Sequence, residues 1–180
     1  MLDRESLKIL MNEVPVFDQL TGTQRETLAE FINYAFCGQG KALFKEGDKG
    51  GSLYYIISGR VEIQKRGAGG KKSVLSVYRK GVTIGEMSLL EPDAVRSATI
   101  VAVEDTELLQ LSRQNFEEIL RNHPEIGIQM MRNIALHLSL RLKDASGKVA
   151  DLTAITKLTN EGRHEIPPDM KDKIKHDRRS

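Results

Sequence analysis

Apolar residues near the start of the chain recur at the spacing of one helix face. The stripe consists of Leu28, Phe31, Ile32 and Ala35, at positions i, i+3, i+4 and i+7. Residues 23–26, Thr-Gln-Arg-Glu, precede it and fit the capping box that marks the first turn of a helix. We therefore predict that residues 1–37 form an N-terminal helical segment.

The pattern changes between residues 38 and 111. Glycines become frequent there and separate short runs of β-favouring residues, such as residues 53–57 and 99–103. Several short strands with regular turn signals predict an antiparallel sandwich or barrel. Residues 67–70 predict a hairpin tip. They do not fit a phosphate-binding loop, because Lys65 stands where that motif requires its first glycine.

Helical spacing returns from Ser112, which is placed to cap a helix that includes residues 115–121. A second, long helix is predicted after Pro124, with an apolar heptad seam. The seam consists of Ile128, Met131, Ala135, Leu138, Leu142, Ala145, Val149 and Leu152. A helix of about 30 residues is ~45 Å long, more than one small barrel can cover. The seam therefore packs either on the barrel or against a second copy, and we predict a homodimer through helix 124–158.

Two features of the sequence affect the continuity and the end of this C-terminal helical region. Gly147 interrupts the heptad and disfavours an unbroken helix. Residues 161–180 are polar, contain a Pro-Pro pair and predict a disordered tail. The C-terminal helices, including the dimerisation helix, are thus assigned to residues 112–160.

Composition and charge narrow the classes of function. Hydrophobic residues make up 39% and charged residues 29% of the 180 positions, as in an ordinary globular chain. A net charge of +2 is too small to predict a nucleic acid or an anionic membrane as partner. A single cysteine, Cys37, allows no internal disulfide. The first residues lack the pattern of a signal peptide, so we expect a cytoplasmic protein without a membrane partner.

One segment, residues 85–99, carries candidate binding chemistry. A Gly85–Glu86 pair opens a short apolar turn, and Arg96 follows ten positions after Glu86. Backbone N–H groups at the start of a short helix attract anions, and an arginine fork suits phosphate oxygens. A carboxylate can accept a hydrogen bond from a ribose hydroxyl. The set suits a sugar phosphate, although a surface Glu–Arg ion pair beside a turn would have the same sequence.

This segment resembles the phosphate-binding cassette of cyclic-nucleotide-binding domains, the family of the bacterial catabolite activator and the regulatory subunit of cAMP-dependent protein kinase. The similarity continues in residues 43–48, 52–61 and 108–120, in the order and spacing of the family. The resemblance implies a mainly β fold with flanking helices. This fold is a double-stranded β-helix (jelly roll or β-roll) over residues 38–111, with N-terminal helices and a long C-terminal helix.

The resemblance also assigns roles to individual residues. Glu86 would bind the ribose 2′-hydroxyl and Arg96 the cyclic phosphate. Gly85 would allow close approach to the sugar, and the N–H groups of Met87 and Ser88 would hold phosphate oxygens. Ser97, after the arginine, would touch the phosphate or the base. A further similarity, of residues 141–149 to the central dimer helix of the catabolite activator, implies that Ser146 contacts adenine.

These roles describe a receptor rather than an enzyme. The expected regulatory ligand is cAMP or cGMP without a metal, and Ser97 favours cAMP. Binding would repack the C-terminal helices and signal to an effector protein that the sequence does not identify. The alternative is a degenerate β-roll without nucleotide, a dimerisation or protein-interaction module. Residues 82–84 leave room for it, because the family usually has an aromatic residue before Gly85.

Two other classes are disfavoured. A cupin-type enzyme needs histidines inside its barrel to hold a metal. All histidines of this chain lie outside the predicted β region, at His123, His137, His164 and His176. Activator-type members of the family continue into a helix-turn-helix domain, but only a short polar segment follows residue 160, so we predict no direct DNA binding.

Overall fold

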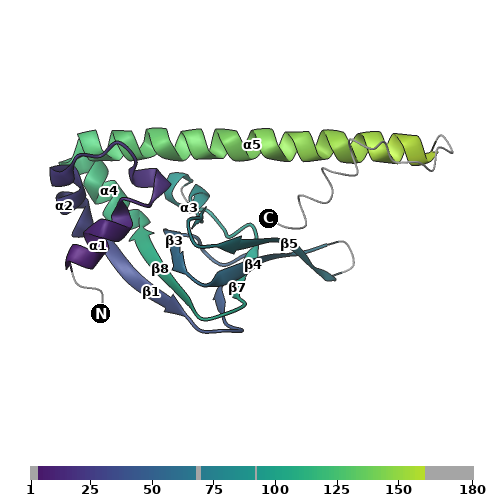
Figure 1. The fold of residues 1–180 in the computed structure, drawn as a ribbon, viewed down its shortest axis with the longest axis horizontal. Helices are drawn as coiled ribbons and strands as arrows, with labels where there is room; N and C mark the ends of the chain where they lie inside the picture. Colours follow the sequence, from purple (N-terminus) through teal and green to yellow (C-terminus); the bar gives the residue numbers. More distant parts are fainter. Residues whose placement is uncertain (1–3, 68–69, 92, 161–180) are drawn as a thin grey trace. The chain divides into compact units, whose positions relative to one another are not determined.

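Eight strands form two four-stranded antiparallel sheets in the computed structural model, which describes residues 4–67, 70–91 and 93–160 (Figure 1). One sheet has the order β1-β8-β3-β6 and the other β2-β7-β4-β5. The strands are β1 (Ile32–Cys37), β2 (Ala42–Phe44), β3 (Ser52–Ser58), β4 (Arg60–Arg66), β5 (Lys72–Arg79), β6 (Thr83–Ile84), β7 (Thr99–Ala102) and β8 (Thr106–Ser112). The predicted β-roll is confirmed.

Aliphatic side chains from both sheets form a core between them. Its fully buried members are Cys37, Ile56, Val61, Ile84, Ile100, Ala102 and Leu108. Burying one such large aliphatic side chain stabilises the fold by about 1.5–3 kcal/mol. Cys37 is a buried free thiol, and burial raises the pKa of its thiol. The cysteine therefore serves as a small apolar core residue.

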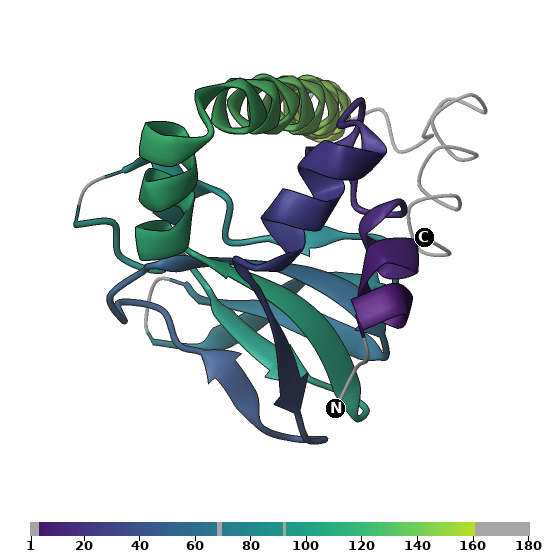
Figure 2. The ribbon, with the colours of Figure 1, turned by 90° about the vertical axis from the view of Figure 1, so that its left-hand side faces the viewer.

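Helices precede the first strand, interrupt the β region once and follow the last strand (Figure 2). They are α1 (Arg4–Met11), η1 (Pro15–Phe17), α2 (Gly22–Ala29), α3 (Met87–Leu90), α4 (Arg113–Asn122) and α5 (Pro124–Asn160). Helix α2 has a capping box, but it joins Thr21 and Gln24, two residues before the predicted one. Thr21 Oγ1 accepts from the Gln24 backbone N–H at 3.2 Å, and the Gln24 side chain accepts from Thr21 N–H at 2.9 Å. Both segments fit the motif, and the chain uses the earlier one.

The prediction of helix through residue 37 is wrong, because residues Ile32–Cys37 form strand β1. This strand pairs with β8 over its whole length, from Ile32↔Leu111 to Cys37↔Thr106. Its apolar residues share a helical spacing with the end of α2 by coincidence. Backbone pairing with a distant strand overrides that local pattern. The β-roll therefore begins at Ile32 rather than at residue 38.

The predicted cap of α4 is confirmed, since the Ser112 hydroxyl accepts a hydrogen bond from Asn115 N–H at 3.1 Å. The chain forms two compact units, Met1–Ile134 and Ala135–Ser180, and α5 runs through the boundary between them. Within the first unit, α5 buries Ile126, Met130 and Ile134. The Asn133 side-chain amide, also buried, donates to the carbonyl oxygens of Val16 (3.0 Å) and Asp18 (2.8 Å).

The predicted seam of α5 lies on a different face from these buried residues. Among its members, Ile128 is 64%, Leu142 68% and Leu152 63% exposed. Whether the barrel or a second copy covers the seam stays a prediction. Helix α5 is continuous through Gly147. Strands β4 and β5 form the predicted hairpin, although residues 68–69 at its tip lie outside the described residues. The predicted tail, residues 161–180, also lies outside them.

Within the part of the chain that the structure describes, no helix has an apolar stretch long enough to cross a bilayer.

Candidate functional site

Gly85 lies at the junction of β6 and α3 and has a left-handed backbone, with φ of +78°. A Cβ atom there would lie 2.5 Å from Arg96 Nη1 and 2.7 Å from the Ser52 carbonyl oxygen. Any side chain would collide with both groups and would strain the backbone as well. Glycine at this position therefore lets the arginine pass directly over the turn.

Arg96 is buried, with only 6% of its surface exposed. Its Nη1 donates to the Ser52 carbonyl oxygen and to Ser88 Oγ, each at 2.9 Å. Its buried Nε has no hydrogen-bond partner among the described residues. Because the guanidinium is planar, Nε and Nη2 form a side edge of the kind that binds carboxylate or phosphate in a bidentate pair. One end of Arg96 is thus held by protein atoms, while Nε on the side edge has no partner in the described part of the chain.

Aromatic rings rather than acidic groups surround this cation. The guanidinium carbon lies 4.0 Å from the centre of the Phe44 ring and 5.8 Å from that of Tyr54. No ion pair to Arg96 occurs among the described residues. Burial lowers the pKa of the Arg96 guanidinium, although the nearby Tyr54 and Asp48 act in the opposite direction. A buried cation in such surroundings is destabilising unless an anion joins it.

Helix α3 lies beside the arginine. Its Ser88 hydroxyl, 4% exposed, accepts from Arg96, while the Ser88 backbone N–H donates to the Gly85 carbonyl oxygen at 3.0 Å. The expectation that this N–H holds a phosphate oxygen thus requires the bond to Gly85 to be shared or replaced. The Met87 side chain is 47% exposed.

A second arginine fixes the other side of α3. Arg113, the first residue of α4, donates through Nε to the Ser88 carbonyl oxygen at 2.8 Å. Its Nη2 also donates to the carbonyl oxygens of Ser88 and Glu91. Its backbone N–H donates to the Gly51 carbonyl oxygen at 2.7 Å. Arg113 therefore connects the 85–96 segment directly to α4.

The loop before β3 holds the segment from the opposite side. Gly47 N–H donates to the Arg96 carbonyl oxygen at 2.9 Å, and Arg96 N–H donates to the Asp48 carbonyl oxygen at 2.8 Å. A Cβ atom on Gly50 would lie 2.4 Å from Ser88 Oγ, so the two backbones are in close approach. These contacts fix the position of Arg96 on both sides of the turn.

The structure brings together Gly85, Ser88 and Arg96 among the predicted site residues. Glu86 is buried at 8% exposure directly after Gly85, whereas Ser97 is exposed next to Arg96. Ser146 is exposed on α5 and belongs to the second unit, so its predicted contact with a base stays a prediction.

Sequence reasoning missed the residues that position the arginine. These are Phe44, Gly50, Ser52, Tyr54 and Arg113. Most lie 40 or more positions from Arg96 in the sequence, and only the fold brings them near. The family resemblance covered the segments 43–48, 52–61 and 108–120 without assigning these residues a role, and the Gly50–Gly51 pair was a further signal, because glycine often marks a close backbone approach.

The donor set of the site suits an oxyanion rather than a metal. Among the described residues, no group of three or more His, Cys, Asp or Glu side chains is placed to hold a metal ion. An oxyanion would supply an acceptor to the orphaned Nε and a counter-charge to the buried guanidinium.

Comparison with known proteins identifies the same region. Residues 36–123 match the family model of the cyclic nucleotide-binding domain. The chain is 36% identical to the Cyclic AMP receptor protein of Thermus thermophilus over 135 residues, which cover 75% of this chain and 60% of that receptor. The matched part is only 6% of a longer relative, the lysophospholipase nte1 of Aspergillus terreus.

Solved structures agree. The catabolite activator protein of Thermus thermophilus superposes with a TM-score of 0.67 at 33% identity, covering 82% of this chain and 72% of that one. The structure of cAMP-bound PfPKA-R superposes with a TM-score of 0.58 at 30% identity, covering 67% of this chain and 44% of that one. With the β-roll and the 85–96 segment described above, these matches show that the chain belongs to the cyclic-nucleotide-binding domain family.

Proposed function

We propose that this chain is a receptor for a cyclic purine nucleotide, with cAMP as the favoured ligand, and that it signals by repacking its C-terminal helices rather than by catalysis. The observation that carries the proposal is Arg96, a buried cation whose Nε finds no acceptor among the described residues. A buried unsatisfied donor costs about 1–3 kcal/mol. A phosphate oxygen at this edge would remove that cost.

In the proposed complex the cyclic phosphate lies against the Nε–Nη2 edge of Arg96. Ser52 and Ser88 keep Nη1 in place, so the fork is oriented before the ligand arrives. Glu86 accepts a hydrogen bond from the ribose 2′-hydroxyl. Its carboxylate would repel the phosphate, so the two residues fix opposite parts of the ligand and set its orientation.

Replacing Glu86 tests the ribose role. Glu86→Ala is expected to reduce the preference for cAMP over 2′-deoxy-cAMP by roughly ten- to hundredfold, the effect of one hydrogen bond to a charged group. Competition binding of the two ligands to wild type and variant measures this ratio. Glu86→Gln is the matched control, because it keeps an acceptor and should lose less of the preference. An unchanged ratio in Glu86→Ala would rule out the ribose role.

Two relatives favour adenine as the base. The Thermus relative is named a cyclic AMP receptor, and PfPKA-R was solved with cAMP bound. By analogy, Ser97 contacts the phosphate or the base at this site, and Ser146 contacts adenine from α5. cGMP is the competing ligand, and parallel titrations separate the two.

Signalling would run from the nucleotide site to α4 through Arg113. This residue holds the carbonyl oxygens of Ser88 and Glu91, so a shift of α3 on nucleotide binding must move or break its bonds. If α4 packs in two ways and the protein binds nucleotide more tightly in one of them, nucleotide binding increases the population of that state.

Hydrogen exchange tests this connection. In the wild type we expect nucleotide to change amide protection in both α3 and α4. In Arg113→Ala the change in α3 should persist and that in α4 should shrink, because the direct link is lost. Arg121→Ala, an exposed arginine in the last turn of the same helix, is the control and should behave like the wild type. An undiminished response of α4 in Arg113→Ala would contradict the proposed route.

We also propose that the receptor is a homodimer through α5 and acts on an effector protein. The exposed apolar seam supports this, because Ile128, Leu142 and Leu152 are each more than 60% exposed. Exposed apolar residues in a heptad favour a helix–helix interface. If neither nucleotide binds, the same seam favours the second candidate, a β-roll that serves only in dimerisation.

A further inference from the structure

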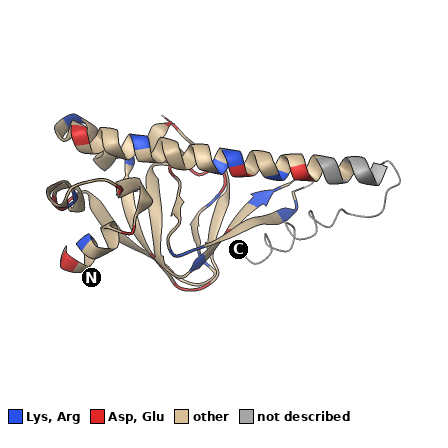
Figure 3. Cartoon of the chain, turned by 45° about the horizontal axis from the view of Figure 1, so that its top comes forward, with Lys and Arg blue, Asp and Glu red and all other residues tan. Residues whose placement is uncertain are grey.

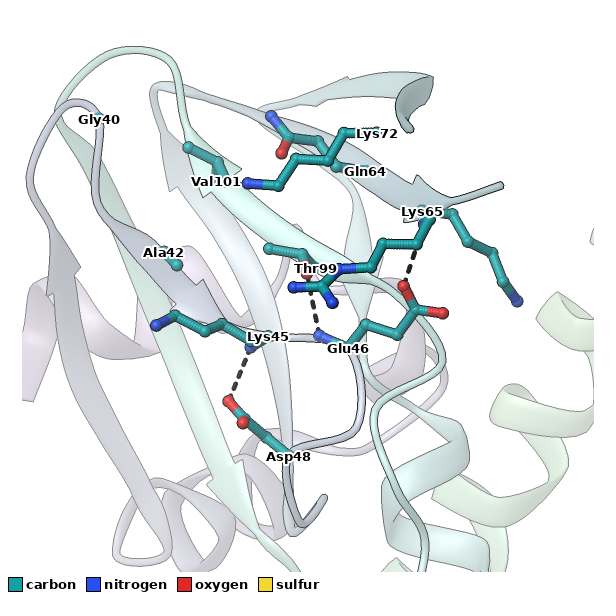
Figure 4. Close-up of a pocket in the computed structure, with 11 residues that line it drawn as sticks. Gly40, Ala42, Lys45, Glu46, Asp48, Gln64, Lys65, Lys72, Thr99 and Val101 are labelled. Carbon is teal, nitrogen blue, oxygen red and sulfur yellow. Dashed lines mark hydrogen bonds between the residues drawn. The ribbon is translucent and has the colours of Figure 1, made fainter. Parts of the chain in front are cut away.

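A hollow lies on the β2-β7-β4-β5 sheet and has a volume of about 380 Å³ (Figure 4). Its lining is largely charged. The charged residues are Lys45, Glu46, Asp48, Lys65, Arg66 and Lys72, and the others are Gly40, Ala42, Gln64, Thr99 and Val101. Neither Arg96 nor Glu86 is among these residues. The volume falls within the range of small-molecule sites.

Cations exceed acids around this hollow, and the acids are held by backbone groups. Glu46 Oε2 accepts from the Arg66 backbone N–H at 3.1 Å, and Asp48 Oδ2 accepts from the Lys45 backbone N–H at 2.8 Å. No ion pair joins the side chains of Lys45, Arg66 or Lys72 to a carboxylate among the described residues.

The side chains enter the hollow from different elements. Lys72, on β5, extends over Gln64 towards Val101, while Lys45 lies on the opposite side (Figure 4). Lys65 stands at the rim and points away (Figure 4). An anion in the centre would therefore be approached by cations from two sides. The polar groups of Gln64 and Thr99 are already hydrogen bonded, since the Gln64 amide donates to Glu62 Oε2 at 3.0 Å and the Thr99 hydroxyl accepts from Glu46 N–H at 2.9 Å.

The register of the hairpin gives an independent reason to expect an anion. Arg66 and Lys72 are directly opposite each other on β4 and β5, and like charges in such a pair are destabilising. The other like-charged pair of this hairpin, Arg60↔Arg79, is relieved because Arg60 forms an ion pair with Glu104 at 2.9 Å. Among the described residues, no ion pair relieves the Arg66–Lys72 pair in this way. Lys and Arg are visible on both strands of the hairpin (Figure 3). A violation of the cross-strand pairing preference, as in this like-charged pair, occurs mainly at functional sites.

We propose that this hollow binds a small anion that carries two or more phosphate groups. A single charge would leave part of the cluster uncompensated, whereas a di- or triphosphate can contact Lys45, Arg66 and Lys72 together. The two sites adjoin at Asp48, which lines the hollow and whose carbonyl oxygen accepts from Arg96 N–H at 2.8 Å. Because Arg96 itself is not part of the lining, we expect the hollow to be occupied whether or not Arg96 has a ligand.

Calorimetric titration with tripolyphosphate at fixed ionic strength tests the proposal. Wild type should bind it at least tenfold more tightly than orthophosphate. The double variant Arg66→Gln/Lys72→Gln should weaken binding by about tenfold or more, as expected when charge-assisted hydrogen bonds are lost. Its melting temperature should be equal or higher, because the like-charge repulsion is removed.

Three further titrations identify the site. Arg121→Gln/Arg132→Gln removes the same charge from exposed helix positions and should change affinity less than twofold. Arg96→Ala should retain tripolyphosphate binding, and Arg66→Gln/Lys72→Gln should retain cyclic-nucleotide binding if that function holds. The proposal is overturned by absent binding, by equal affinity for orthophosphate, by equal loss in the helix variant, or by loss in Arg96→Ala.

Discussion

Arg96→Ala is expected to weaken cyclic-nucleotide binding by about 2–5 kcal/mol, the range for removing one partner of a buried charge pair. This corresponds to about 30-fold to several thousandfold in Kd. The reason is specific to this arginine: its Nη1 is held by Ser52 and Ser88, and its Nε is left without an acceptor until a ligand arrives. Calorimetry on wild type and variant measures the loss.

Two other variants distinguish loss of binding from loss of fold. Arg96→Lys keeps the charge but not the planar fork, and we expect it to bind more weakly than wild type and more tightly than Arg96→Ala. Arg121→Ala removes an exposed arginine outside the site and should bind normally. Normal nucleotide affinity in a folded Arg96→Ala protein would show that the phosphate binds elsewhere.

Leu138→Asp/Leu142→Asp is expected to convert a dimer into monomers. Both residues are members of the predicted seam, and Leu142 is 68% exposed on α5. Two carboxylates on each helix would be desolvated and would repel their counterparts across a two-fold interface. Sedimentation velocity over a range of concentrations measures the change.

The same helix offers a matched control. Leu136 and Leu140 are exposed leucines of α5, at 58% and 49%, but neither belongs to the heptad seam. Leu136→Asp/Leu140→Asp introduces the same charges and should remain dimeric. Dissociation of this control but not of the seam variant would place the interface on the other face of the helix. A wild-type chain that sediments as a monomer would refute the dimer.

The local pattern predicted an antiparallel sandwich or barrel and the family resemblance specified a β-roll, but neither placed its beginning at Ile32. Residues 53–57, a β-favouring run between glycines, form part of strand β3, and all of them except Tyr54 are buried. Strand β1 was missed because residues Ile32–Cys37 continue the spacing of the preceding helix, and their pairing with β8 joins residues more than 65 positions apart. A local window contains no information on such a pairing.

The candidate site was predictable to the extent that it is continuous in sequence. Gly85, Ser88 and Arg96 lie within twelve residues, and the structure brings them together as expected. The residues that orient Arg96 come from β2, β3 and α4, so their roles depend on the tertiary fold. The bond from Ser88 N–H to Gly85 was also unforeseen, because it depends on the conformation of the turn.

The degenerate β-roll remains the competing account of the same fold. Both accounts have the same sheets, helices and exposed seam. They differ only in whether Arg96 binds a nucleotide. A module without nucleotide would keep a buried guanidinium whose Nε has no partner, at a continuing cost in stability. Ligand binding is therefore the property that separates the two accounts.

Calorimetric titration of the purified chain with cAMP and cGMP tests the central claim most directly. The receptor proposal predicts one site per chain with micromolar or tighter affinity, and tighter binding of cAMP than of cGMP. Failure of the folded protein to bind either nucleotide would contradict it and would leave a dimerisation module as the function of this β-roll.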